Sequence, residues 1–346
     1  MEKNGYCVAI VGATGEVGRM MIKTLERYPI PVKSLKLLAS RRSVGKQFEF
    51  RQSKVTVEEL TADSFKEVDI ALFSAGGDIS KEYVPKAVQS GALVIDNTSI
   101  YRMDETIPLV VPEINLADVL THHRVIANPN CSTIQLVMAL KPLLETYGIK
   151  RVDVSTYQAV SGAGAKAIDE YEQQRLNKEY VPVILPVRSE AKHYKIDGNV
   201  IPQIDVFLSN AYTKEEMKMI NETKKILHHE TLQMSATCVR VPVLYGHSVS
   251  ATIKLETPVT STKELKDLFE NTPYLCLVDD PDTQTYPMPQ AVEAEDEVLV
   301  GRVRRDLFDE TVVHLFVVAN NILKGAALNS VQIAYALHQQ DWFGDK

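Results

Sequence analysis

Cys131 is the residue whose type and setting most directly indicate chemistry in this chain. It follows an apolar segment at residues 125–127 that is typical of a strand, and it precedes apolar residues spaced as on one face of a helix. Backbone N–H groups and the helix dipole at a helix N-terminus favour the nucleophilic thiolate. An isolated cysteine is more often buried and inert, but Cys131 has polar neighbours on both sides. We therefore predict a nucleophilic cysteine at the start of a helix.

Arg240 and His247 are also of chemical interest, because they bracket a short turn between two predicted strands. A guanidinium group can fork onto a carboxylate, and an imidazole can transfer a proton. We expect a hairpin to bring the two side chains together. A lone histidine is more often structural, so the functional interpretation depends on Cys131. No His, Cys and carboxylate cluster has the spacing of a metal site, and we expect no metal.

A glycine-rich turn near the start of the chain predicts a dinucleotide site. Gly12, Gly15 and Gly18 have the spacing G-x-x-G-x-x-G between a strand at residues 6–11 and a helix that runs to about residue 28. Such a turn lets a pyrophosphate approach the backbone and rest on the helix N-terminus. The alternative is a tight strand-to-helix turn without a ligand.

The end of the second predicted strand indicates which dinucleotide binds. An NAD site usually has an acidic residue there that holds the ribose 2′-hydroxyl. This chain instead has Ser40, Arg42 and Ser43, which suit a 2′-phosphate. We therefore predict NADP, although a solvated basic loop would look similar.

Three further positions are ambiguous when each is taken alone. Arg102 follows a predicted strand and can hold a phosphate or carboxylate, or lie on the surface. The small-residue turn at 161–164 can pass close to a cofactor or simply connect a strand to a helix. Thr213 and Glu216 form a capping box, which places Glu215 and Lys218 on one helix face as an ion pair.

Length and composition indicate two domains of a globular enzyme. The 346 residues exceed one ordinary core, and the net charge of −7 argues against a nucleic-acid partner. Four dispersed cysteines suit a reducing cytoplasm, and we expect neither a signal peptide nor a membrane span.

The pattern of predicted elements changes near Cys131. Strands and helices alternate before it, which predicts a parallel sheet with helical crossovers. After it, longer alternating strands at residues 152–160, 236–241, 248–256 and 311–318 predict an α+β domain with a largely antiparallel sheet. A last helix at about 321–339 can return to the first domain. We expect a first domain of residues 1–130 plus 328–346 and a second of 131–327.

Together these pieces resemble aspartate-β-semialdehyde dehydrogenases, in order along nearly the whole chain. The matching segments are the glycine loop, Ser40–Gly45, Asn97 to Arg102, Asn128–Thr133, Gln158 with Ser161–Gly164, Ile201–Asp205, Glu215 to Lys218, Arg240 to His247, Tyr286–Pro289, and Asn321 with Lys324–Ala327. Thr98 and Asn320 stand where the family often has Ser and Asp, and residues 192–199 diverge.

The resemblance implies a role for each matching residue. Cys131, next to Asn130, accepts the acyl group, His247 is the acid/base, and Gln158 orients the substrate or thioester. Substrate contacts implied in the same way are Arg240 to the α-carboxylate, Glu215 to the amino group, and Arg102 with Lys218 to phosphate. The implied cofactor contacts are Gly12, Thr14, Gly15, Glu16, Val17, Ser40, Arg42, Ser43, Ser74, Gly76, Asn97, Ser161, Gly162 and Asn321.

The fold implied is a Rossmann-type NADP domain with a second α+β catalytic and dimerisation domain resembling that of glyceraldehyde-3-phosphate dehydrogenase, in a cytoplasmic homodimer. The reaction implied is NADPH-dependent reductive dephosphorylation of L-aspartyl-4-phosphate to L-aspartate 4-semialdehyde through a Cys131 thioester. This step belongs to lysine, threonine, methionine, isoleucine and diaminopimelate biosynthesis. Two alternatives stay open: an N-acetyl-glutamyl-phosphate reductase, for which an acid at Glu215 would have no purpose, and a catalytically silent NADP-binding regulatory protein.

Overall fold

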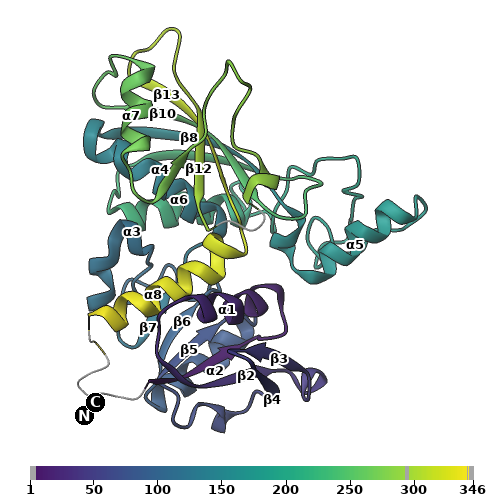
Figure 1. Cartoon of the computed structure of the whole chain (residues 1–346). Helices are drawn as coiled ribbons and strands as arrows, with labels where there is room; N and C mark the ends of the chain where they lie inside the picture. Colours follow the sequence, from purple (N-terminus) through teal and green to yellow (C-terminus); the bar gives the residue numbers. More distant parts are fainter. Residues whose placement is uncertain (1–4, 293–295, 341, 343–346) are drawn as a thin grey trace. The chain divides into compact units, whose positions relative to one another are not determined.

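The computed structural model describes residues 5–292, 296–340 and 342, which form two compact units. The first contains the chain up to Asn130 together with the segment from Ala326 onward, and the second runs from Cys131 to Gly325 (Figure 1). The helices are α1 (Glu16–Arg27), α2 (Gly77–Gln89), α3 (Pro112–Asn115), α4 (Cys131–Tyr147), α5 (Ala165–Leu176), α6 (Lys214–Leu227), α7 (Thr262–Glu270) and α8 (Leu328–Gln339). The strands are β1 (Tyr6–Val11), β2 (Val32–Ala39), β3 (Gln47–Phe50), β4 (Ser53–Glu59), β5 (Ile70–Phe73), β6 (Leu93–Asp96), β7 (Val125–Ala127), β8 (Ile149–Gln158), β9 (Gln233–Arg240), β10 (His247–Leu255), β11 (Leu275–Leu277), β12 (Val298–Arg305) and β13 (Val312–Ala319).

The first unit is built on a seven-stranded sheet in the order β3-β4-β2-β1-β5-β6-β7. All neighbouring strands are parallel except β3, which is antiparallel to β4. The chain moves outward from β1 in one direction through β2 and in the other through β5. In an open α/β sheet, ligands bind at such a switch point, outside the carboxyl ends of the strands. This sheet therefore confirms the predicted Rossmann-type domain and places its candidate ligand site after β1 and β5.

Residues on both faces of the central strands β1, β5 and β6 are buried, as expected where helices cover both sides. Val8 and Ile10 of β1 join a core with residues of α1 and α8. Ala9 and Val11, which alternate with them, are also fully buried. The glycine turn after β1 is thus held on a strand with no solvent-exposed face.

The second unit is built on a six-stranded sheet in the order β11-β12-β13-β10-β8-β9. The pairs β12–β13, β13–β10 and β10–β8 are antiparallel, whereas β8–β9 and β11–β12 are parallel, so the sheet is more mixed than predicted. The expected hairpin between β9 and β10 is wrong, because β8 lies between these two strands. Helix α4 packs on the sheet between α6 and α7, and this layer supports the strand ends that carry the site.

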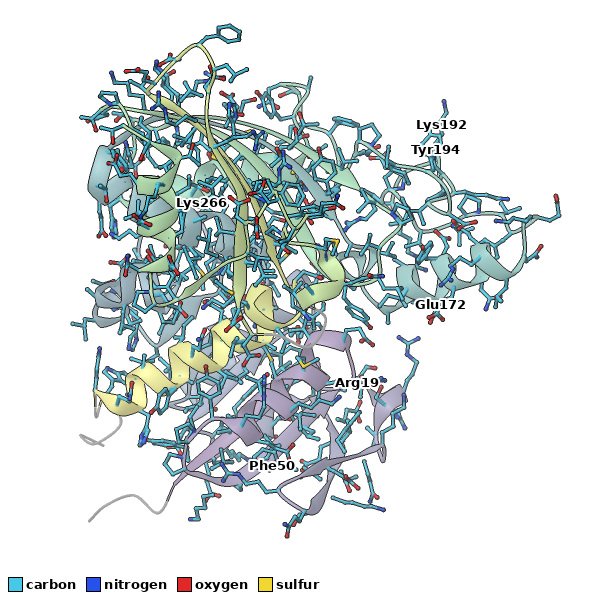
Figure 2. The ribbon with its side chains drawn as sticks, turned by 45° about the horizontal axis from the view of Figure 1, so that its top comes forward. Arg19, Phe50, Glu172, Lys192, Tyr194 and Lys266 are labelled. Atoms are coloured by element: carbon cyan, nitrogen blue, oxygen red, sulfur yellow. The ribbon has the colours of Figure 1, made fainter. Side chains whose placement is uncertain are left out.

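Helix α5 begins an arm that extends away from this sheet (Figure 1). Two buried side chains of α5 fasten the irregular segment that follows: Glu170 accepts hydrogen bonds from the N–H groups of residues 183–185, and Gln174 accepts from those of residues 196 and 197. Figure 2 shows Glu172 on α5 and Lys192 and Tyr194 on the returning segment. Residues 192–199, whose sequence diverges from the family, therefore lie in this arm.

Several of the expected elements differ from the observed ones at their ends. Strand β8 stops at Gln158, and the last helix begins at Leu328 after a short π-helix at Leu323–Ala327. The expected second domain boundary, after residue 327, lies two residues from the observed one. None of the helices in the described part of the chain is long and apolar enough to span a bilayer.

Candidate active site

Cys131 is the first residue of α4 and is half-buried. Residues 132–140 of the helix are all buried, which fixes its N-terminal end. A Cβ atom at Gly325 would lie 2.7 Å from the Cβ of Cys131, so only glycine fits beside the cysteine. The structure confirms the predicted helix N-terminus, and Asn130, which precedes it, is buried.

Arg240 and His247 flank Gln158 in one row across the second sheet. Arg240, the last residue of β9, pairs with Gln158, the last residue of β8. Ser248 pairs with Tyr157, which places His247 at the same level on the other side. Residues paired across neighbouring strands share a face of the sheet. The sheet therefore brings the three side chains together without a hairpin.

One peptide ties the two outer residues of this row to each other. The N–H of Ala159 donates a hydrogen bond to Nδ1 of His247 at 3.0 Å. The carbonyl oxygen of Ala159 accepts a hydrogen bond from Nη1 of Arg240 at 2.7 Å. Both backbone groups of Ala159 thus orient side chains that come from different strands.

The surroundings of His247 keep its imidazole neutral. His247 is fully buried, and burial together with the nearby Arg240 guanidinium lowers its pKa to about 3, against the opposing effect of Glu215. Burial also lowers the pKa of Arg240, while attraction to Glu215 and Cys131 raises it. Arg240 remains the fixed positive charge near Cys131.

Gln158 belongs to a buried polar network with helix α6. Its Oε1 accepts a hydrogen bond from the hydroxyl of Thr156 at 2.9 Å, and its Nε2 donates to Oε1 of Glu215 at 3.1 Å. Lys218 donates to the other Glu215 oxygen at 3.2 Å and to Asp205 at 2.8 Å. Glu215 is 5% exposed, so it is not the solvated partner that an isolated ion pair on a helix would suggest.

The capping box predicted at the start of α6 is confirmed. The N–H of Thr213 donates to Glu216, whose own N–H donates to the hydroxyl of Thr213. Glu216 also accepts a hydrogen bond from the N–H of Cys238 on β9 at 3.0 Å. This cap joins the helix that carries Glu215 to the strand that carries Arg240.

The turn after β8 is tied to Asn321. Its Nδ2 donates to the hydroxyl of Ser161 at 2.9 Å, and its Oδ1 accepts from the N–H of Gly246 at 3.0 Å. A Cβ atom at Gly162 would lie 3.0 Å from both Nη1 of Arg240 and Nε2 of His247. The structure therefore places Gly162, predicted as a cofactor contact, directly against Arg240 and His247.

The glycine loop of the first unit has the geometry of a dinucleotide cradle. Gly12 has φ +89°, and a Cβ there would lie 2.5 Å from the carbonyl oxygen of Ser74. A Cβ at Gly18 would lie 2.3 Å from the carbonyl oxygen of Gly12. Glu16 and Val17 form the first turn of α1 beyond Gly15. These close approaches leave backbone, rather than side chains, facing a ligand at the helix N-terminus.

The other predicted residues of the first unit lie at the carboxyl ends of neighbouring strands. Ser40, Arg42 and Ser43 follow β2, and the hydroxyl of Ser43 lies 3.4 Å from that of Thr14 in the glycine loop. Gly76, with φ +99°, precedes α2. Asn97 and Arg102, which follow β6, are joined by a hydrogen bond. Nη2 of the buried Arg102 donates to the carbonyl oxygen of Asn97 at 2.7 Å.

Sequence reasoning gave no role to two residues that the structure connects to the site. Asp205 lies in a segment that matches the family, but only its contact with Lys218 shows what it does. Ala159 acts through its backbone, so its residue type carries no signal.

Comparisons with known proteins identify the family. Residues 7–122 match the NAD-binding domain of semialdehyde dehydrogenases, and residues 140–324 match their dimerisation domain. The chain is 53% identical over 337 residues to the aspartate-semialdehyde dehydrogenase of Bacillus subtilis, covering 96% of this chain and 97% of the relative. It is 51% identical over 336 residues to that of Aquifex aeolicus, covering 96% and 98%.

A solved structure agrees with these relatives. Aspartate semialdehyde dehydrogenase II of Vibrio cholerae, crystallised with a ligand abbreviated ASA, superposes with a TM-score of 0.91 at 43% identity and covers 97% of this chain and 99% of its own. The matched domains confirm a nicotinamide cofactor and a homodimer. The chain belongs to the aspartate-semialdehyde dehydrogenase family.

Proposed function

We propose that this protein is a cytoplasmic, NADPH-dependent enzyme that converts L-aspartyl-4-phosphate to L-aspartate 4-semialdehyde through a thioester on Cys131. The observation that carries the proposal is the joint arrangement of a cysteine at the head of α4 and a row of buried Arg240, Gln158 and His247 in the same unit. NADPH supplies a hydride when it is bound. The protein supplies the nucleophile, the position of the substrate and the charges around it.

The substrate has two charged ends besides its reacting carbon, and the second unit offers a partner for each. Arg240 binds the α-carboxylate, because guanidinium and carboxylate form paired, charge-assisted hydrogen bonds. Glu215, held by Gln158 and Lys218, binds the α-amino group. Gln158 orients the acyl group that Cys131 attacks, and His247 acts at its carbonyl oxygen.

Arg102 and Lys218 bind the departing phosphate. Lys218 forms salt bridges to Asp205 and Glu215, which hold its ammonium group beside the residue proposed for the amino group. Arg102 is held by the carbonyl of Asn97. These two cations favour the leaving of phosphate by stabilising its negative charge.

The preference for NADP rests on Ser40, Arg42 and Ser43. The loop after β2 presents hydroxyls and exposed arginines where an NAD site has an acidic residue. The glycine loop holds the pyrophosphate at the N-terminus of α1. The other proposed cofactor contacts are Ser74, Gly76, Asn97, Ser161, Gly162 and Asn321.

Two alternatives are weaker. An N-acetyl-glutamyl-phosphate reductase has no amino group for the buried Glu215 carboxylate, which Gln158 and Lys218 hold in place here. A silent NADP-binding protein has no need of a cysteine at the head of α4 beside Arg240.

The test is phosphate-dependent reduction of NADP by the purified enzyme with L-aspartate 4-semialdehyde, run beside N-acetylglutamate semialdehyde and beside NAD. We expect activity with the first substrate and preference for NADP. Cys131→Ala should abolish turnover and leave NADP affinity nearly intact. Cys276→Ala, on β11, is the matched control and should stay active. Full activity of Cys131→Ala, or preference for the N-acetylated substrate, would contradict the proposal.

A further inference from the structure

Asp205 lies in a segment that is anchored to both β9 and α6. Upstream of it, the backbones of Ile201 and Arg240 exchange two hydrogen bonds, at 3.0 and 2.8 Å. Directly after it, the carbonyl oxygen of Val206 accepts a hydrogen bond from the N–H of Lys214, the first residue of α6, at 2.9 Å. The position of Asp205 relative to both elements is therefore fixed.

The backbone of Asp205 has a left-handed conformation that its own side chain stabilises. Its φ is +67°, a value that few residues other than glycine adopt. Aspartate and asparagine tolerate it best, because their short polar side chains bond nearby backbone groups. Oδ1 of Asp205 accepts the N–H of Val206 at 2.9 Å. One carboxylate oxygen is thus held by the loop itself, and the other, Oδ2, accepts a hydrogen bond from Nζ of Lys218 at 2.8 Å.

The ammonium group of Lys218 lies between two carboxylates. Its Nζ is 2.8 Å from Oδ2 of Asp205 and 3.2 Å from Oε2 of Glu215. Glu215 is buried, and its other oxygen accepts the hydrogen bond from Gln158. The shorter contact of the ammonium is therefore with Asp205, which draws it away from the buried carboxylate.

The charges of these three groups match one additional cation. Asp205 and Glu215 carry two negative charges, and Lys218 carries one positive charge. The substrate's α-ammonium would balance the second carboxylate, just as its α-carboxylate would balance the nearby guanidinium of Arg240. Without Asp205, Lys218 alone would neutralise Glu215, and the substrate's ammonium would lose its counter-charge. A charge that is removed from water without a partner is costly.

We propose that Asp205 is a positioning residue for recognition of the substrate's α-amino group, because it holds the ammonium of Lys218 and so leaves the charge of Glu215 for the substrate. This inference rests on the proposed function, in which Glu215 binds the amino group and Lys218 binds phosphate. The negative charge of Asp205 opposes an anion beside Lys218. Its contribution therefore belongs to the amino end of the substrate and not to the phosphate end.

Two replacements remove the carboxylate while they preserve the backbone. Asp205→Asn keeps an oxygen for the N–H of Val206 and tolerates the positive φ, but it has no negative charge for Lys218. Asp205→Gly adopts the same φ without strain. Asp197→Asn is the matched control, because it breaks an ion pair with Lys178 at 2.7 Å in the arm. Thermal unfolding of each variant checks that it still folds.

Three constants, measured in the phosphorolytic direction with NADP, separate the two ends of the substrate. They are the KM for L-aspartate 4-semialdehyde, the KM for phosphate, and the Ki of succinate semialdehyde, which has the same carbon chain without the amino group. Both Asp205 variants should raise the semialdehyde KM by roughly three- to tenfold, since the ion pair that they break is partly buried. The phosphate KM and the Ki of succinate semialdehyde should not rise, and Asp197→Asn should match the wild type in all three constants.

Several results would overturn the proposal. An equal rise of all three constants would show that Asp205 has only a structural role. A phosphate KM that rises more than the semialdehyde KM would show that Asp205 merely holds Lys218 for phosphate. Wild-type constants in Asp205→Asn would show that the carboxylate charge is not needed. Absence of semialdehyde activity in the wild type would instead refute the proposed function, and this inference with it.

Discussion

Two replacements of Arg240 distinguish what its positive charge contributes to substrate binding from what its two-point hydrogen bonding contributes. Nη1 is committed to the carbonyl of Ala159 at 2.7 Å, and Nε is buried without a hydrogen bond to any described residue. The edge formed by Nε and Nη2 is the edge that binds a carboxylate with two parallel hydrogen bonds. Arg240→Lys keeps a positive charge but loses this edge, and Arg240→Leu loses both.

The size of the effect follows from the bonds that are lost. Each of the two hydrogen bonds from Arg240 to the carboxylate contributes about 1.5–3 kcal/mol, as is usual for a bond to a charged group. When both are lost, water replaces part of the binding free energy of the second bond. Losing the fork should therefore cost about 2–4 kcal/mol in transition-state binding, or roughly 30- to 1000-fold in kcat/KM. Arg240→Lys should lie at the lower end of this range and Arg240→Leu at the upper end.

The assay is the phosphorolytic direction, with both substrates varied. The Arg240 variants should raise the KM for the semialdehyde more than the KM for phosphate, and Arg102→Leu should do the opposite. Thermal unfolding of each variant checks that the buried site still folds. If the Arg240 and Arg102 variants change the same KM, our assignment of the carboxylate and phosphate ends is wrong, although the reaction class would survive.

Three further predictions test the cofactor loop, a buried cap and a half-buried histidine. Arg42→Ala should weaken NADP binding much more than NAD binding in a titration, with Arg41→Ala as the neighbouring control; equal losses for both cofactors would mean that Arg42 does not contact the 2′-phosphate. Glu216→Gln weakens the cap and the bond from the N–H of Cys238, so the free energy of unfolding in urea should fall by about 1–3 kcal/mol, and an unchanged value would refute this role. Burial lowers the pKa of His122 from 6.5 to about 4. Between these two pH values the unfolded chain binds more protons than the folded protein, so the wild type loses stability as the pH falls from about 6.5 to about 4. His122→Gln should flatten that part of the stability curve, and an unaltered slope would count against burial as the cause.

The sequence predicted the first unit well, because its strands are short apolar runs separated by amphipathic helices. It was less informative about the second sheet. Strand β12 was not predicted. Its register shifts between Gly301 and Arg304, where Arg302 has φ +51°. Such a bulge interrupts the strict alternation of apolar and polar residues by which a strand is predicted. The order of strands was also hidden, because neighbours along the chain need not be neighbours in a sheet.

The site residues illustrate the same limit. Cys131 was found because a strand, a polar turn and a helix follow one another along the chain. Arg240 and His247 were correctly paired, but the expected hairpin between them was wrong. The element that joins them is the backbone of Ala159, and backbone atoms are common to all residue types.

The position of the row formed by Arg240, Gln158 and His247 follows from the same alternation that builds the core. On β10, His247 is in step with the buried residues Val249, Ala251 and Ile253. Gln158 continues the buried face of β8 in the same way, and Arg240 continues that of β9. A slip of one residue in any of these strands would turn its member of the row to the other face together with its apolar residues. The apolar pattern that holds the sheet against α4 therefore also sets the register of the active site, so substitutions deep in these strands should affect catalysis through alignment as well as through stability.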